Sequence, residues 1–462
     1  RSSTVWWALL LAVLVGVGIS SLAWWLRSPG SSSRATASLT VHRAAITVPG
    51  DIQIENFPSY HPTLAASPDG KWLVFVAKRN GTQQLFKRPF DRNEVLPIPG
   101  SENAVHPFFS PDGRWVAFFD RVEGKLKKVD LEGGSPIALF DTPIPWGGTW
   151  GPDGTIVLNP DQFAGLLRVA ETGGPAEPLL LPDLEEGTLD FYFPSFLPDG
   201  KAVLFTAWQG GLTQVWDDVG ILDLESGETS ILVEDAVAAR YLHSGHLLYA
   251  RGDHVEVVPF DLETRTVKGS AVPITDPVTV HPFWNIPDLA VTRDGTAAFL
   301  PGLRRLSRQL VEVDLGGNSR PILDGKQPFT RARYSPDGTY LAVSTIEAGR
   351  SSISVVNMKT GVETHLVGEG NRMFPVWSPD RERIAFAMET SDPPASWSIF
   401  SQRARGSESP ELLLEARERG ESLWPYGWSP DGNSLVIGRN IHMPFRAEIW
   451  RLSLNTDREV QP

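Results

Sequence analysis

The stretch ASPDGKWLVFVA, residues 66–77, carries the signal that decides the fold. Its letters SPDG are the residues favoured at the four successive positions of a type I turn. Apolar and β-branched residues then alternate in the way that is typical of a β-strand. The motif therefore predicts a tight turn that joins two antiparallel strands.

The same turn and strand recur along the chain. The further copies are FSPDGRWVAFFD around Asp112, WGPDGTIVLN around Asp153, FLPDGKAVLFTA around Asp199, VTRDGTAAFL around Asp294, YSPDGTYLAVST around Asp337, WSPDRERIAFAM around Asp380 and WSPDGNSLVIGR around Asp431. A degenerate copy, LHSGHLLYAR, lies near Gly245. These nine units follow one another at intervals of 41 to 51 residues, which indicates a repeat architecture.

Each unit also has a second half. GKLKKVDLEGGSPIAL (Gly124 to Leu139) and VGILDLESGETSILV (Val219 to Val233) both read as a strand, a polar turn and a further strand. Four short strands per repeat are typical of a β-propeller blade, whereas two unrelated β-sandwiches would not repeat the unit nine times. We therefore predict an all-β fold, a single β-propeller of about eight or nine four-stranded blades over residues 39–462. A spare strand within Ser38 to Asp51 is expected to pair into the last blade and close the ring.

The beginning of the chain predicts a membrane anchor. Val5 to Leu26 are 22 residues without a charge, with a tryptophan pair at each end of the run. At about 1.5 Å per residue such a helix spans roughly 30 Å, the thickness of the hydrocarbon core. A cleaved signal peptide is the alternative, and it predicts a shorter apolar core and a small-residue cleavage site. We expect a transmembrane helix over 5–26, a flexible linker over 27–38 and, because the chain opens on Arg1, an N-terminally truncated fragment.

Composition narrows the possible functions. The net charge is −13, which argues against contact between this region and nucleic acid. The absence of cysteine excludes disulfides, thiolate metal sites and cysteine catalysis.

The ordered set of motifs resembles a known group. SPDG followed by a strand, with GKLKKVDLEGGSPIALFDTP and then WGGTWGPDGTIVL, is similar to TolB-type, WD-repeat-like propellers. More narrowly, the chain looks like the extracytoplasmic propeller half of bacterial transmembrane serine/threonine protein kinases. The resemblance implies a kinase domain before Arg1, a single pass through the bacterial inner (cytoplasmic) membrane, and a periplasmic propeller that senses a ligand, peptide or protein.

Catalytic motifs are missing from the sequence. It has no kinase glycine-rich loop, HRD or DFG motif, and no GxSxG nucleophile elbow. We therefore predict no enzyme activity, cofactor or metal for these residues, although the resemblance implies a kinase parent chain.

One set of side chains is a candidate ligand site. Large or charged residues stand shortly before several turns, often followed by proline, at the start of the strand that lines the channel of a propeller. The predicted ligand-binding residues are His61, His106, Trp146, Phe193, Trp284, Arg331, Phe374 and Trp424. The alternative interpretation is that these side chains pack between neighbouring blades.

Three functions remain open. The leading one is a non-catalytic sensor of a membrane kinase, in which association of two copies of the chain would carry the signal. Gly16 and Ser20 are small residues four apart that would let two helices approach closely. The alternatives are the sensor of a membrane-bound winged-helix transcription regulator and a TolB-like envelope scaffold.

Overall fold

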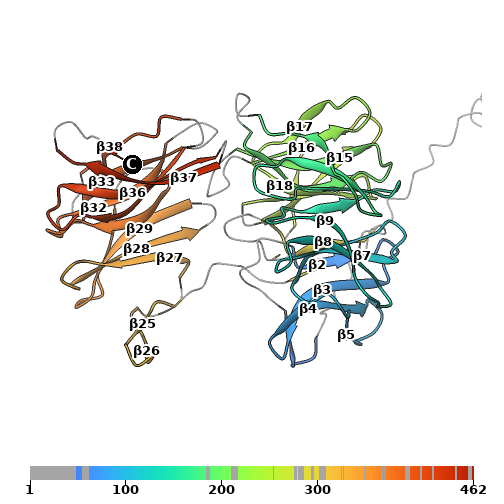
Figure 1. Ribbon diagram of the computed structural model, residues 1–462, viewed down its shortest axis with the longest axis horizontal. Coiled ribbons are helices and arrows are strands. Elements are labelled where there is room, and N and C mark those ends of the chain that lie inside the picture. The colour runs from blue at the N-terminus through green and yellow to red at the C-terminus, as the bar shows by residue number, and fades with distance from the viewer. Residues whose placement is uncertain are drawn as a thin grey trace, which may run out of the picture. The chain divides into compact units, whose positions relative to one another are not determined.

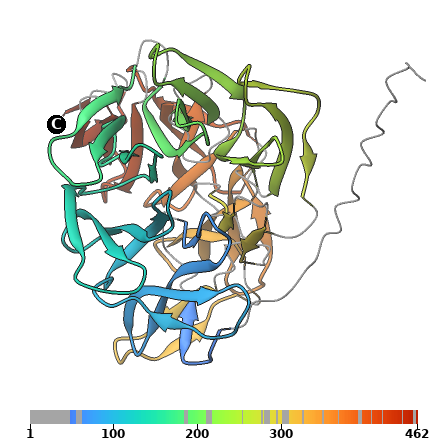
Figure 2. The same cartoon turned by 90° about the vertical axis from the view of Figure 1, so that its right-hand side faces the viewer.

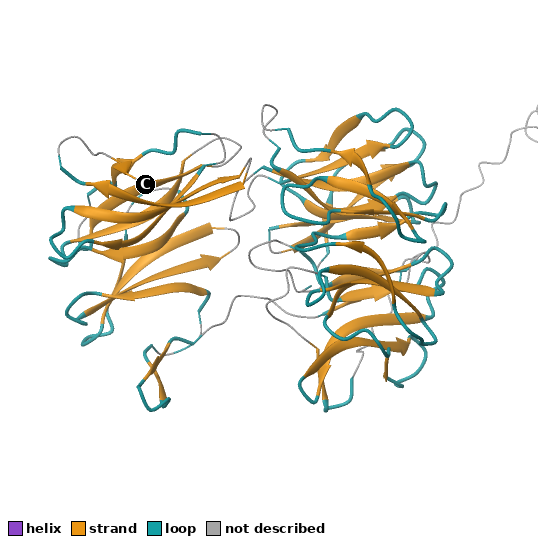
Figure 3. Ribbon diagram, in the orientation of Figure 1, coloured by secondary structure: helices purple, strands orange, loops and turns teal. Residues whose placement is uncertain are grey.

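The computed structural model describes residues 48–462 except 55–61, 184–187, 210–216, 253, 275–277, 279–285, 293–295, 301–308, 324, 326, 348–349, 367, 369, 391–395, 406–407, 419–420, 443–444, 456–459 and 462. Val48–Pro462 form one compact unit. The regular elements of the described residues are all β-strands, joined by turns and loops (Figure 3). This part of the chain is therefore all-β, as predicted.

The repeated turn has the predicted geometry. In the first copy the backbone N–H of Gly70 donates to the carbonyl of Ser67 at 3.0 Å. The Ser67 hydroxyl donates to Asp69 Oδ1 at 2.6 Å and accepts from the backbone N–H of Trp72 at 2.9 Å. Serine and aspartate are favoured at these two positions because their side chains satisfy the polar groups of the turn.

The last turn position requires a left-handed backbone. Gly70 and Gly113 have φ values of +71° and +74°, which glycine adopts without a steric penalty. Arg381 occupies the same position in its own copy and has a φ of +67°.

Each repeated turn joins two strands of one antiparallel sheet, and we number the sheets as blades one to nine in chain order (Figure 1). Blade one contains β1 (Ile52–Ile54), β2 (Leu64–Ala66), β3 (Trp72–Arg79), β4 (Thr82–Pro89) and β5 (Leu96–Pro97). Blade two contains β6 (Ala104–Phe109), β7 (Trp115–Asp120), β8 (Lys125–Asp130) and β9 (Ile137–Asp141). Blade three contains β10 (Gly148–Trp150), β11 (Thr155–Leu158), β12 (Leu166–Ala170) and β13 (Glu177–Leu180).

Blades four to six continue the pattern. Blade four contains β14 (Asp190–Phe196), β15 (Ala202–Trp208), β16 (Asp218–Asp223) and β17 (Thr229–Val233). Blade five contains β18 (Val237–Leu242), β19 (His246–Arg251), β20 (His254–Asp261), β21 (Thr266–Val267) and β22 (Val272–Pro273). Blade six contains β23 (Leu289–Val291) and β24 (Ala297–Phe299). A separate hairpin follows, formed by β25 (Val311–Val313) and β26 (Ser319–Pro321).

The last three blades are again four-stranded. Blade seven contains β27 (Phe329–Tyr334), β28 (Tyr340–Glu347), β29 (Arg350–Asn357) and β30 (Glu363–His365). Blade eight contains β31 (Arg372–Trp377), β32 (Arg383–Thr390), β33 (Ser396–Arg403) and β34 (Glu411–Leu414). Blade nine contains β35 (Ser422–Trp428), β36 (Ser434–His442), β37 (Phe445–Ser453) and β38 (Val460–Gln461). A single parallel bridge, Trp397 to Ser422, links blades eight and nine.

Apolar cores lie between neighbouring blades from one to six and again from seven to nine. Val74 of blade one shares a core with Val116 of blade two, and Ile384 of blade eight shares one with Ala342 of blade seven. Blades one to five, coloured blue to green in Figure 2, follow one another in chain order. This stacking of four-stranded sheets is the architecture of a β-propeller.

Blade six contacts two other blades. Its Leu289 packs in a core with Leu248 of blade five, and its Ala290 packs with Phe75 of blade one. In addition, Asp288 Oδ1 accepts hydrogen bonds from the backbone N–H and the hydroxyl of Thr63, at 3.1 and 2.9 Å. The first six blades therefore make a continuous circuit of contacts, and the predicted single ring of eight or nine blades is not confirmed.

Several predicted segments lie largely or wholly outside the described residues. They are the helix over 5–26, the linker over 27–38 and most of the predicted closing strand, Ser38 to Asp51. The strand that directly follows, β1, pairs with β3 of blade one. Within the described residues, no helix has the length and apolar character that crossing a membrane requires.

Candidate functional site

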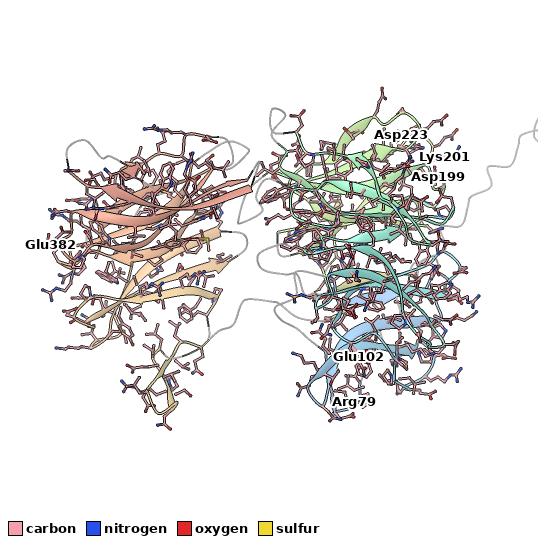
Figure 4. The ribbon with its side chains drawn as sticks, in the orientation of Figure 1. Arg79, Glu102, Asp199, Lys201, Asp223 and Glu382 are labelled. Atoms are coloured by element: carbon pink, nitrogen blue, oxygen red, sulfur yellow. The ribbon has the colours of Figure 1, made fainter. Side chains whose placement is uncertain are left out.

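A pocket of about 400 Å³ opens between blades eight and nine. It lies beside the repeated turns of these two blades, and Figure 4 labels Glu382 in the turn of blade eight. The lining residues are Ser378, Pro379, Asp380, Arg383, Ser401, Glu411, Leu413, Trp428, Asp431, Gly432 and Leu454. Its volume is within the range of pockets that bind small ligands or single side chains of a partner.

The two turn aspartates give one wall of the pocket negative charge. Asp380 accepts a hydrogen bond from the Ser378 hydroxyl at 2.5 Å, and Asp431 accepts one from the Ser429 hydroxyl at 2.5 Å. These hydroxyl bonds lower the pKa of both carboxyl groups below their ordinary value. Both groups are therefore ionised at neutral pH.

Arg383 is the only cationic side chain among the lining residues, and it is hydrogen-bonded to two other lining residues. Arg383 Nη2 donates to Ser401 Oγ at 2.8 Å and to Glu411 Oε2 at 2.8 Å. Three carboxylates (Asp380, Asp431 and Glu411) thus face one guanidinium, a balance of −2 from the charged lining residues. The pocket therefore favours a cationic group.

Apolar groups complete the pocket. Trp428 Nε1 donates to the carbonyl of Val376 at 3.3 Å, which fixes the indole at the boundary of the two blades. Leu413, Leu454 and Trp428 also belong to the core between blades eight and nine. A ligand that enters meets both apolar carbon and negative charge.

The predicted ligand-binding residues that the structure describes lie on or beside the first strand of their blades. His106, Phe193 and Phe374 have φ values of +49°, +50° and +59°, and each stands where the register of the strand shifts. A proline follows each of them. The proline after each of these residues fits a β-bulge, since proline cannot donate to a regular ladder.

Most of these side chains pack between blades. His106 and Phe193 stack with ring centroids 6.3 Å apart, and their relative exposures are 2% and 1%. Trp146 is also buried and stacks on Tyr192 at 4.8 Å. The structure thus brings His106, Trp146 and Phe193 close to one another, as blades two, three and four meet.

A second group forms in the C-terminal blades. The Arg331 guanidinium lies 5.2 Å from the ring centroid of Phe374, which is 4.8 Å from that of Trp424. Arg331 is exposed, Phe374 is half-buried and Trp424 is buried. His61 and Trp284 lie outside the described residues. Packing accounts for the buried members of the set, and ligand binding by any of them stays a prediction.

Sequence reasoning missed a buried polar network between blades three and four. Asp190 is fully buried and accepts hydrogen bonds from Asn159 Nδ2 and from the backbone N–H groups of Phe163, Gly165 and Phe191. Burial raises the pKa of Asp190 to about 7. No motif marks these residues in the sequence, because their contacts join segments about 30 residues apart.

The described residues contain no group of three or more histidine, aspartate or glutamate side chains arranged to hold a metal ion. The turn aspartates instead bond to serine hydroxyls and backbone N–H groups of their own turns.

No protein-family model matches the chain. A TolB homolog of Chlorobium luteolum is 30% identical over 167 residues, which cover 35% of this chain and 36% of that protein. A TolB homolog of Protochlamydia amoebophila is 29% identical over 123 residues, which cover 25% and 26% of the two chains. The matched part thus spans about a third or less of the length of these relatives.

Solved structures resemble the chain at low identity. TolB from Acinetobacter baumannii is 15% identical with a TM-score of 0.25, over 86% of this chain and 80% of that chain. The propeller of Dos1 is 12% identical with a TM-score of 0.35, over 73% and 92% of the two chains. A puromycin hydrolase is 15% identical with a TM-score of 0.38, over 71% and 58%.

Proposed function

We propose that the chain is a non-catalytic protein-interaction propeller that binds an exposed segment of a partner protein. The observation that carries this proposal is the pocket between blades eight and nine, whose lining combines charged and apolar groups. The sequence similarity to TolB homologs supports a propeller of the same kind. No catalytic motif occurs in the sequence.

Peptide selection on the purified chain tests this proposal. A phage-displayed library of random peptides should yield a recurring motif on the chain and none on an unrelated protein of equal net charge. The selected peptides should stay intact on prolonged incubation with the chain, as measured by mass spectrometry. A selection without a recurring motif contradicts the interaction function, and cleavage of the peptides contradicts its non-catalytic character.

We also propose a 6 + 3 architecture in place of one large ring. Blades one to six would close on each other through the contact between Asp288 and Thr63, and blades seven to nine would form a separate stack. The hairpin β25–β26 separates the two groups in the sequence. Leu310 and Ile322, which flank its strands, pack on the core of blade seven.

The cellular role is a further part of the proposal. The family resemblance and the apolar run Val5 to Leu26 support a periplasmic sensor of a membrane-spanning serine/threonine kinase. The similarity to TolB homologs favours the alternative of an envelope scaffold. Reading the DNA upstream of the Arg1 codon separates them, because a kinase requires a glycine-rich loop, HRD and DFG there.

A further inference from the structure

The pocket occupies a place that a lysine fills elsewhere in the chain. In blades one, two and eight, the seventh residue after the turn serine pairs with a residue of the third strand. These pairs are Val74 with Lys87, Ala117 with Lys128, and Ala385 with Ser401. Ser401 of the pocket is therefore the counterpart of the two lysines.

Both lysines reach across to the next blade. Lys87 Nζ donates to the carbonyl of Leu131 in blade two at 2.7 Å, and Lys128 Nζ donates to the carbonyl of Glu171 in blade three at 2.7 Å. Each ammonium also lies over indole rings. Lys87 is 5.1 Å from the ring centroid of Trp72, and Lys128 is 4.9 Å from that of Trp115 and 5.5 Å from that of Trp150. Trp72 and Trp115 stand five residues after their turn serines, where blade eight has Arg383, whereas Trp150 stands where blade nine has Trp428. A carbonyl and an aromatic ring thus hold a cation between two blades.

The pocket has a residue equivalent to those whose backbone carbonyls accept hydrogen bonds from the two lysines. Leu131 and Leu454 each donate their backbone N–H to the carbonyl of the residue that follows the turn glycine, and Glu171 donates to the carbonyl of the turn glycine itself. Leu454 of the pocket is therefore the counterpart of the two residues whose carbonyls accept from lysine. Trp428 stands directly before its turn, as Trp150 does.

In other blades a larger side chain occupies the position of Ser401. The counterparts of Ser401 in blades four and seven are Ile221 and Val355, and both are buried apolar residues. Among these five residues, Ser401 has the shortest side chain. Its hydroxyl instead accepts from Arg383.

We propose that the pocket between blades eight and nine receives a lysine side chain of the partner protein, in the place that Lys87 and Lys128 fill within the chain. The lysine stem would pack against Leu413 and Leu454, and its ammonium would face Trp428 and the turn carboxylates. This assignment rests on the proposed interaction function and specifies the side chain that the partner supplies.

The test uses two defined peptide mixtures on the purified full chain. Both are acetylated heptapeptide mixtures, one with lysine at the central position and one with norleucine there. The chain should retain the lysine mixture at least fivefold more than the norleucine mixture. Ser401→Lys supplies the ammonium internally and should remove at least four fifths of that retention. The matched control Ser226→Lys adds the same charge on an exposed turn of blade four and should change nothing.

A second pair of variants keeps the test decisive if Ser401→Lys does not fold. Asp431→Asn keeps the oxygen that accepts from Ser429 but removes the charge, so it should lower retention of the lysine mixture at least threefold. Asp112→Asn makes the same change in the turn of blade two and should have no effect.

Equal retention of the two mixtures, or retention that survives both Ser401→Lys and Asp431→Asn, overturns the lysine assignment. Peptides from the random library that bind without a basic residue would leave the interaction function standing and overturn this assignment alone. A random library that yields no motif contradicts the interaction function itself.

Discussion

At the residue scale, Arg381 shows how far a repeat tolerates a wrong residue in its turn. Its φ of +67° is one that glycine adopts freely and other residues adopt at a cost of about 1–2 kcal/mol. Its guanidinium forms an exposed ion pair with Asp337 at 2.6 Å, which contributes about 0–1 kcal/mol. The backbone cost therefore outweighs the ion pair.

We expect Arg381→Gly to raise the free energy of unfolding by about 0.5–1 kcal/mol. Urea denaturation of the variant and the parent chain measures this difference. Arg381→Ala is the control, since it loses the ion pair and keeps the strained backbone, and it should not stabilise. A loss of stability in Arg381→Gly would show that the ion pair is the larger contribution.

Asp190 makes the free energy of unfolding depend on pH, and the direction of the change follows from its raised pKa. Its pKa is about 7 in the folded chain and 3.8 for an ordinary aspartate, so the folded state holds the proton more tightly. The free energy of unfolding should therefore fall as the pH rises from about 4 to about 7, by on the order of 3 kcal/mol if the group acts alone.

Asp190→Asn tests this dependence. Asparagine keeps an oxygen that can accept from Asn159 and Gly165, and it carries no proton to lose. Urea denaturation at pH 5 and pH 8 should show a smaller loss of stability in the variant than in the parent chain. An equal loss in both would mean that other groups cause the pH dependence.

At the level of the strands, two hydrogen bonds between the residues that precede β2 and β23 join blade one to blade six. Asp288 precedes β23, Thr63 precedes β2, and Asp288 accepts two hydrogen bonds from Thr63 in a buried position. Asp288→Ala leaves the Thr63 donors unsatisfied, which costs about 1–3 kcal/mol of stability. Asp91→Ala, an exposed change in blade one, should cost less than about 0.5 kcal/mol. Equal effects of the two variants would argue against closure of blade six on blade one.

The elements were predictable because the motif has a local mechanism. Ser67, Asp69 and Gly70 fix the turn through bonds within six residues, and the alternating strand after it buries one face on each neighbour. Closure was not predictable, since Thr63 and Asp288 are 225 residues apart and carry no pattern. Similarly, Pro107 and Pro194 mark bulges only once the register of their strands is known.

At the scale of the whole molecule, the repeat explains where a binding site can arise. Identical blades would bury identical contacts, so a pocket appears where one repeat departs from the others. Ser401 is such a departure, and sequence alignment of the nine units could have found it by comparison with Lys87 and Lys128. The large residues at the start of the first strands were instead the visible signal, and of the six that the structure describes, His106, Trp146, Phe193 and Trp424 are buried.

Hydrogen–deuterium exchange of the purified chain, with and without a peptide from the random library, tests whether the pocket between blades eight and nine is the binding site. Binding should slow the exchange of backbone amides in residues 378–383, 411–413 and 428–434, which line the pocket or lie beside it. The turns of blades one and two, around Asp69 and Asp112, should exchange unchanged. Protection confined to other blades, or no protection by a peptide that binds, would show that this pocket is not the binding site.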